Sequence, residues 1–172
     1  MRSILSCLLA LVLTAAATQA LAGKRLDKVV EGFWTAYAYE NDDGAFSHCS
    51  VETRFKDGMT LGLRAYDGGF NLHLENDDWQ MDTDGRSAVE VVIAGAYDRF
   101  TSMTVVSNRE LRAGFGFDKA FWKAFRAGNT MRLTLADGRA WSIDLKGTST
   151  TAGAVESCYR RHFAKRASAL FD

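Results

Sequence analysis

Short polar turns built from Asp, Asn and Gly recur along the chain and separate stretches in which apolar and polar residues alternate. Examples are Asp57-Gly58, Gly68-Gly69, Asp84-Gly85 and Asp137-Gly138. Such pairs tolerate the positive φ that tight hairpin turns need. The chain contains no proline, so these residues must make the turns. The pattern predicts a mainly β protein of the α+β type, with antiparallel strands that form a β-sandwich or a strongly curved sheet.

The alternation with period two places the expected strands in sequence. They are residues 34–39, 46–55, 59–66, 70–75, 79–81, 89–94, 97–106, 111–117, 130–136 and 139–145. In the strand 70–75, Phe70, Leu72 and Leu74 share one face, and Asn71, His73 and Glu75 share the other. We therefore expect this strand to be half-buried.

Two segments have helical spacing instead. Residues 119–127 carry apolar side chains on one helical face, and Asp118 is a favourable N-cap for them. A C-terminal helix is expected from about residue 151 to residue 163, capped by Thr148 or Ser149, with Cys158 on its inward stripe. Residues 166–172 are expected to be a frayed tail.

The first 22 residues have the order of a secretory signal. Arg2 precedes an apolar run of about ten residues, and Ala20-Leu21-Ala22 resembles a cleavage site. The apolar run is too short for a membrane span, which takes roughly 20 residues. We therefore expect residues 1–22 to be a signal peptide, residues 23–165 to form a single β-rich domain, and the protein to be periplasmic or secreted without a stable membrane anchor.

Removal of residues 1–22 would leave two cysteines, Cys49 and Cys158. Two thiols of a small domain usually pair in an oxidising compartment, and their spacing is not that of a redox C-x-x-C motif. We expect a structural disulfide between them. Two free thiols, or one reactive thiol, are the alternatives.

The charge balance gives no reason to expect a polyanionic partner. After loss of Arg2, 20 basic residues stand against 21 acidic ones, a net charge of about −1. This balance provides no electrostatic footprint for nucleic acid or for an anionic membrane. The expected partner is a protein or another component of the cell envelope.

No local motif indicates a catalytic, metal or cofactor site. The histidines His48, His73 and His162 lack metal-binding spacing, and nucleophile-elbow, Walker and dinucleotide motifs are missing, so we expect no cofactor, no metal and no enzymatic activity. His73 beside Glu75 is the one pair that could act as an oriented base, with His48 as a further candidate.

Aromatic residues are abundant near the N-terminus of the expected domain and in the first helix. Either Trp34 or the pair Tyr37 and Tyr39 must face outward, since they alternate along one strand. Trp122 falls off the apolar stripe of its helix. The expected binding residues are therefore Trp34, Tyr37, Tyr39, His73 and Trp122.

The segment Trp141 to Cys158 reads W-S-I-D-L-K-G-T-S-T-T-A-G-A-V-E-S-C, a last strand followed by a short helix that carries a cysteine. It resembles the ending of several families of small exported Gram-negative proteins, including the invasion-associated locus B type. Additional cysteines that those families often carry are missing here. The resemblance implies a periplasmic or secreted, non-enzymatic β-rich module linked to the envelope or to host contact.

Three hypotheses of function follow. The first is an exported binding or accessory module of the cell envelope or host interface. The second is an inhibitor of a secreted hydrolase such as lysozyme. The third is an enzyme with a dispersed site around His73 and Glu75.

Overall fold

Ten strands, each antiparallel to its neighbours, form one continuous sheet in the computed structural model, which describes residues 23–171. The strand order is β1-β2-β3-β4-β5-β8-β7-β6-β9-β10. The strands are β1 (Lys24–Glu31), β2 (Trp34–Glu40), β3 (Phe46–Arg54), β4 (Thr60–Tyr66), β5 (Gly69–Glu75), β6 (Arg86–Ile93), β7 (Tyr97–Ser107), β8 (Glu110–Gly116), β9 (Thr130–Leu135) and β10 (Ala140–Asp144). The expected export signal, residues 1–22, lies outside the described residues.

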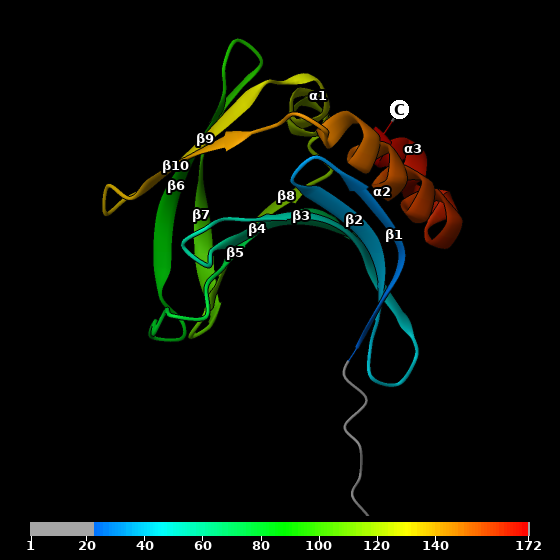
Figure 1. The fold of residues 1–172 in the computed structure, drawn as a ribbon, viewed down its shortest axis with the longest axis horizontal. Coiled ribbons are helices and arrows are strands. Elements are labelled where there is room, and N and C mark those ends of the chain that lie inside the picture. Colours follow the sequence, from blue (N-terminus) through cyan, green and yellow to red (C-terminus); the bar gives the residue numbers. More distant parts are fainter. Residues whose placement is uncertain (1–22, 172) are drawn as a thin grey trace, which may run out of the picture.

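The sheet is strongly curved and not closed. Strands β1 to β5 bend into an arch, and β6, β7, β9 and β10 continue the sheet beyond it (Figure 1). The mainly β fold class is confirmed. Of the two architectures expected, the curved sheet forms, because all the strands of the described chain belong to one hydrogen-bonded sheet.

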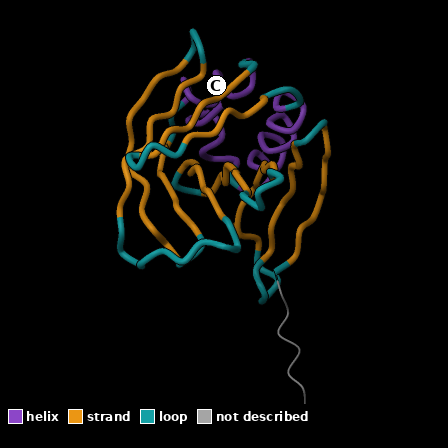
Figure 2. Tube along the Cα trace, turned by 60° about the vertical axis from the view of Figure 1, so that its left-hand side comes forward, coloured by secondary structure: helices purple, strands orange, loops and turns teal. Residues whose placement is uncertain are grey.

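The helices are α1 (Lys119–Ala127), α2 (Thr148–His162), the 3-10 turn η1 (Ala164–Arg166) and α3 (Ala167–Phe171). They gather on one side of the curved sheet (Figure 2). Helix α2 packs against β1, β2 and β3 on the outer side of the arch (Figure 1). Among the described residues, no helix is long and apolar enough to cross a bilayer.

The core lies between this outer side of the arch, the helices, and the strands β6, β9 and β10, whose Val91, Leu133 and Ile143 are buried in it. Alternate residues of the central strands point into it, among them Leu61, Leu63, Leu72 and Leu74, each at most 1% exposed. Trp34 is fully buried, and its ring meets that of Phe125 edge-on with centroids 5.2 Å apart. The period-two apolar pattern thus faces the core in both strands. The expectation that β5 is half-buried was wrong, because Asn71 and His73 on its other face are buried too.

The predicted disulfide is confirmed. Cys49 of β3 bonds to Cys158 of α2, with their Cα atoms 6.0 Å apart. Both cysteines belong to the core. The bond fastens the terminal helix to an early strand, and the covalently closed loop spans 109 residues.

The expected boundaries of the first helix, 119–127, are those of α1 in the structure. Asp118 caps this helix as expected, because its Oδ1 accepts a hydrogen bond from the Phe121 amide at 2.9 Å. Helix α2 begins at Thr148, three residues earlier than expected, and no side-chain hydrogen bond caps it. The Thr148 hydroxyl instead donates to backbone carbonyls, including that of Phe125 at 2.8 Å. The core contact therefore replaces the expected cap.

Two strand predictions were wrong. Residues 79–81 lie in the loop between β5 and β6, not in a strand. The charged segment Lys24–Glu31 forms β1, although no strand was expected there. It is an edge strand whose side chains are mostly exposed, so it lacks the alternation that burial of one face imposes.

The expectation of a frayed tail from residue 166 also needs correction. Residues 167–171 form α3, and the Phe171 ring lies 5.3 Å from Trp122 and 5.2 Å from Tyr159, measured between centroids. Ala167 is buried. These apolar contacts order the segment despite the basic residues before it.

Candidate functional site

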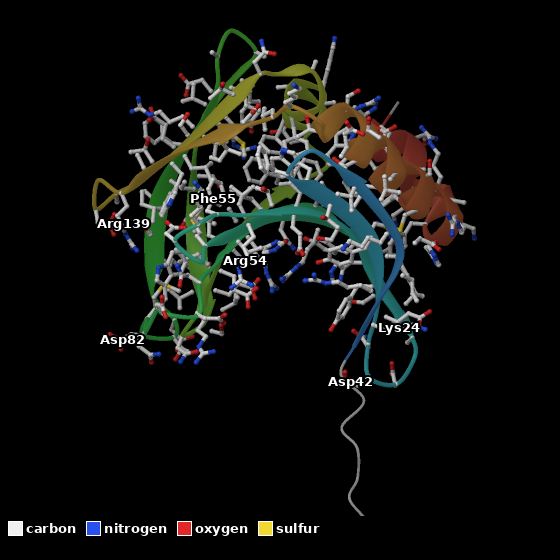
Figure 3. The ribbon with its side chains drawn as sticks, in the orientation of Figure 1. Lys24, Asp42, Arg54, Phe55, Asp82 and Arg139 are labelled. Atoms are coloured by element: carbon white, nitrogen blue, oxygen red, sulfur yellow. A yellow bond between two sulfur atoms is a disulfide. The ribbon has the colours of Figure 1, made fainter. Side chains whose placement is uncertain are left out.

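The inner face of strands β2 to β5 and β8 is polar. Strand register aligns two neighbouring rows of side chains across it: Ser50, Arg64, Asn71 and Gly114 in one row, and Glu52, Gly62, His73 and Arg112 in the next. Figure 3 shows side chains rich in nitrogen and oxygen projecting from the strands into the hollow beneath the arch. We call this surface the polar face.

Two depressions open on the polar face. The first, here called the mixed pocket, has a volume of about 390 Å³, and its charged lining residues are Arg25, Arg54, Arg64, Glu52, Glu75 and Asp77. The second, here called the arginine pocket, has a volume of about 550 Å³, and its polar lining includes Arg64, Arg112, His48, Asn71 and Thr104. His48 and Arg64 line both pockets.

A shared carboxylate holds the two arginines of the arginine pocket. Glu110 Oε1 lies 2.8 Å from Arg64 Nη1 and 2.8 Å from Arg112 Nη2. All three side chains are partly shielded from solvent, so these ion pairs are less screened than pairs on an open surface. The pairing holds both guanidiniums in place on the polar face.

A second ion pair orders the mixed pocket. Arg25 Nη1 lies 2.9 Å from Glu52 Oε1, and the Tyr37 hydroxyl donates to Glu52 Oε2 at 2.7 Å. The Arg25 guanidinium also lies 4.5 Å above the Tyr37 ring. Burial, together with the Glu52 charge, raises the pKa of Tyr37 to about 12. The hydroxyl therefore remains a donor at neutral pH.

His73 sits beneath the surface of the polar face, because the strand beside it carries Gly62. A Cβ at Gly62 would lie 2.2 Å from His73 Cε1, so only glycine leaves room for this ring. The side chain is 1% exposed, and its Nδ1 has no hydrogen-bond partner. Burial, followed by the charges of Arg64 and Arg112, lowers the pKa of His73 well below its usual value, so the ring is neutral.

His48 lies between the two pockets. Its ring stacks on Tyr39 with centroids 5.0 Å apart, and its Nδ1 is 3.0 Å from the Ser47 hydroxyl. Burial, followed by the charges of Arg64 and Arg112, lowers the pKa of His48 to about 4. At neutral pH it offers an uncharged aromatic ring to both pockets.

His73 and Glu75 do not form the oriented base that the sequence suggested. Both lie on the polar face, but no hydrogen bond or ion pair between them occurs within residues 23–171. His73 is also buried, not on an open surface as expected. Burial, and then the neighbouring Glu110, raises the pKa of Glu75. We find no metal-binding cluster of His, Cys, Asp and Glu in this described range.

The candidate aromatic residues divide between two faces. Tyr37 and Tyr39 line the mixed pocket, whereas Trp34 points into the core on the opposite side of β2. Trp122 is 3% exposed and donates its Nε1 hydrogen to Glu156 at 2.7 Å. Trp34 and Trp122 thus contribute no exposed aromatic patch, because the helices cover both rings.

Sequence reasoning missed the charged residues that dominate the site: Glu52, Arg64, Glu110 and Arg112, together with Asn71. One signal was present, namely polar residues at every second position, as in Ser50, Glu52 and Arg54 or in Glu110 and Arg112. This pattern normally marks a solvated face. Only the curvature of the sheet turns it into a hollow.

Comparisons with known proteins show a likeness of the overall fold. No protein-family model and no curated protein matches the sequence. In a search of solved structures, the fold matches that of a small β-rich protein with a TM-score of 0.54 and 12% sequence identity, over 78% of this chain and 97% of the other. The chain therefore has the fold of a class of small β proteins.

This structure, one of those that match, is invasion-associated protein B from Bartonella henselae. The resemblance expected from the segment Trp141 to Cys158 is confirmed at the level of fold. At this identity the likeness concerns the arrangement of the chain only.

Proposed function

We propose that the protein is an exported binding module of the cell envelope or host interface, and that its ligand binds on the polar face. Export is supported by the signal-like residues 1–22, by the disulfide, which suits an oxidising compartment, and by the shared fold with an invasion-associated protein. A binding role, and not catalysis, is supported by the polar face itself.

The observation that carries the proposal is a group of buried polar atoms without partners. Three of the four such atoms among the described residues, Arg64 Nε, Asn71 Oδ1 and His73 Nδ1, belong to the neighbouring strands β4 and β5, and the fourth is the Tyr159 hydroxyl oxygen of α2. An unsatisfied buried polar atom costs about 1–3 kcal/mol. Folded proteins keep such atoms where a ligand or ordered water satisfies them. Their concentration beside two pockets supports a ligand site.

The catalytic alternative has less support. His73 is buried and neutral, and Glu75 does not orient it. A general base must be within hydrogen-bond reach of the proton that it removes. Binding through Arg64, Asn71 and their neighbours needs no such step.

Export is tested by expressing the full chain with its own leader in a Gram-negative host and sequencing the N-terminus of the periplasmic material. We expect the first residue to be Gly23 and both remaining cysteines to resist alkylation until a reductant is added. An unprocessed chain in the cytosol, or two free thiols in the periplasm, contradicts the proposal.

Binding is tested by presenting the exported protein to arrays of glycans, envelope extracts and peptides. Gly114→Trp is the blocking variant, since Gly114 lines the arginine pocket and a Cβ there meets nothing within 4 Å. Ala120→Trp on the exposed side of α1 is the matched control. We expect ligands to be lost with Gly114→Trp and kept with Ala120→Trp. Capture that both variants retain contradicts a site in the arginine pocket, the part of the polar face that Gly114 lines.

A further inference from the structure

The two pockets of the polar face differ in charge. The mixed pocket has three arginines and three carboxylates in its lining. The arginine pocket has Arg64 and Arg112 in its lining, and none of the described carboxylates is part of it. Glu110 neutralises one of the two guanidiniums from the side, so one positive charge is left over. The arginine pocket therefore favours a ligand with a single negative charge.

Both guanidiniums have donors left for a ligand. Arg64 reaches Glu110 through Nη1, which leaves its Nη2 for a ligand, whereas its Nε has no partner and is closed off from solvent. Arg112 reaches the same oxygen through Nε and Nη2, which leaves its Nη1 available. Arginine donors in a fixed plane suit a carboxylate or sulfate oxygen pair. Glu110 thus occupies only some of the donors of Arg64 and Arg112, and we call these two guanidiniums the anion clamp.

Asn71 favours a ligand that carries hydroxyl groups. Asn71 is 8% exposed and lines the arginine pocket, and its Oδ1 is buried without a hydrogen-bond partner. The neighbouring position on β8 is Gly114, so no side chain covers the amide. A carboxamide can accept from one hydroxyl and donate to another. A ligand that carries hydroxyl groups next to its anionic group would satisfy Asn71.

The remaining lining supplies an apolar flank. Tyr66 and Val106 line the arginine pocket, and 36% and 42% of their surfaces are exposed. The volume of about 550 Å³ lies in the range of small-molecule sites. A sugar ring combines a C–H face, several hydroxyls and a position for one acidic group. These match the apolar flank, the Asn71 carboxamide and the one remaining positive charge of the arginine pocket.

From this geometry, and resting on the proposed function, we infer that the arginine pocket binds an acidic sugar. Its single carboxylate or sulfate group contacts Arg64 and Arg112, its hydroxyls contact Asn71, and its C–H face lies against Tyr66. A dianionic phosphate brings more negative charge than the pocket can neutralise, so it is disfavoured.

The test is a titration of the exported, disulfide-bonded protein with small-molecule probes at low ionic strength, in which binding is monitored by the amide signals in NMR spectra. The probes are glucuronic acid, glucose 6-sulfate, glucose 6-phosphate, glucose and inorganic sulfate. We expect glucuronic acid and glucose 6-sulfate to shift the signals of Gly114 and of the Asn71 side chain. Glucose, glucose 6-phosphate and inorganic sulfate should each bind at least about tenfold more weakly.

Two charge-matched variants locate the site. Arg112→Gln removes one arm of the clamp, and a charged contact of this kind should account for about tenfold or more in affinity. Arg54→Gln removes the same charge from the mixed pocket, where Arg54 is mostly exposed, and should leave acidic-sugar binding unchanged. The NMR spectrum of each free variant shows that the fold is kept.

Several outcomes overturn the inference. They are equal binding of glucose and glucuronic acid, equal binding of free sulfate, tighter binding of glucose 6-phosphate, an equal effect of both arginine variants, or no binding of any acidic sugar. The proposed function survives each of these results if another ligand from the arrays is blocked by Gly114→Trp. Its placement of the ligand in the arginine pocket fails separately if that substitution blocks nothing.

Discussion

The contact between Gly62 and His73 decides the shape of the polar face. Because Gly62 has no Cβ, the His73 ring fits over this position and is almost fully buried, and the arginines beside it can border open pockets. A larger residue at position 62 would push the ring outward. The hollow thus depends on one missing methyl group.

Gly62→Ala tests this dependence. The new Cβ would lie 2.2 Å from His73 Cε1, so the enclosed ring has to move, and we expect a loss of about 1–3 kcal/mol in the free energy of unfolding measured in urea. Gly114→Ala is the matched control, since a Cβ there meets nothing within 4 Å. It should be neutral or slightly stabilising, and an equal loss in both variants would contradict the argument.

His48 predicts a pH dependence of stability. Its pKa is about 4 in the folded protein and about 6.5 in the unfolded chain. Above pH 6.5 the ring is neutral in both states and contributes no slope. Below pH 6.5 the unfolded chain binds the proton first, so the free energy of unfolding falls as the pH drops towards about 4, by at most about 1.4 kcal/mol per pH unit.

His73 acts in the same direction, whereas Glu75, with its raised pKa, takes up a proton early in the folded state and opposes the fall. His48→Gln isolates the contribution of His48. We expect urea unfolding of this variant to show a shallower slope between pH 6.5 and 4 than the parent protein, with equal slopes above pH 7. Parallel curves over the whole range would exclude a buried neutral His48.

At the scale of elements, the disulfide joins two elements that lie far apart in the sequence. It ties β3 to α2 and closes a loop of 109 residues. On the chain-entropy model, closing such a loop stabilises the folded state by about 4–5 kcal/mol. Native contacts of α2 with β1 and β2 must otherwise hold the helix.

The double variant Cys49→Ser/Cys158→Ser should therefore lose up to about 4–5 kcal/mol in urea unfolding. The reduced parent protein is the control, because it lacks the bond but keeps both residues, and it should unfold at nearly the same denaturant concentration. If the variant is as stable as the oxidised protein, the sheet and helix contacts alone hold α2 in place.

Local sequence patterns were sufficient to predict most strands and helices but insufficient to predict the candidate site. Strand β5 and helix α1 follow from the alternation of apolar residues and from the Asp118 cap, because contact of one face with the core imposes a period. The burial of the polar face of β5 was not predictable from that alternation. Strand β1 has no buried face, so its sequence carries no such period. The polar face arises from side chains of five strands in register, and the pairing of β5 with β8 cannot be read from either strand alone.

At the scale of the whole molecule, the open sheet brings its two end regions close together without pairing them. Trp34 in β2 donates its Nε1 hydrogen to the Asp144 carbonyl of β10 at 2.9 Å, across 110 residues. A Cβ at Gly147, just before α2, would lie 2.6 Å from the Glu31 carbonyl oxygen. These contacts hold the sheet in its curved shape, and the arch that contains the polar face depends on that shape.

Trp34→Phe separates this link from simple packing. The smaller ring keeps an aromatic contact to Phe125 but removes the donor and leaves a cavity, so we expect a loss of about 2–4 kcal/mol in urea unfolding. Amide hydrogen exchange should quicken in β2 and β10 together, because the hydrogen bond joins them. Trp141→Phe, at a half-buried tryptophan of β10, is the control and should cost less than about 1 kcal/mol. Faster exchange confined to β2 would show that the two end regions are held independently.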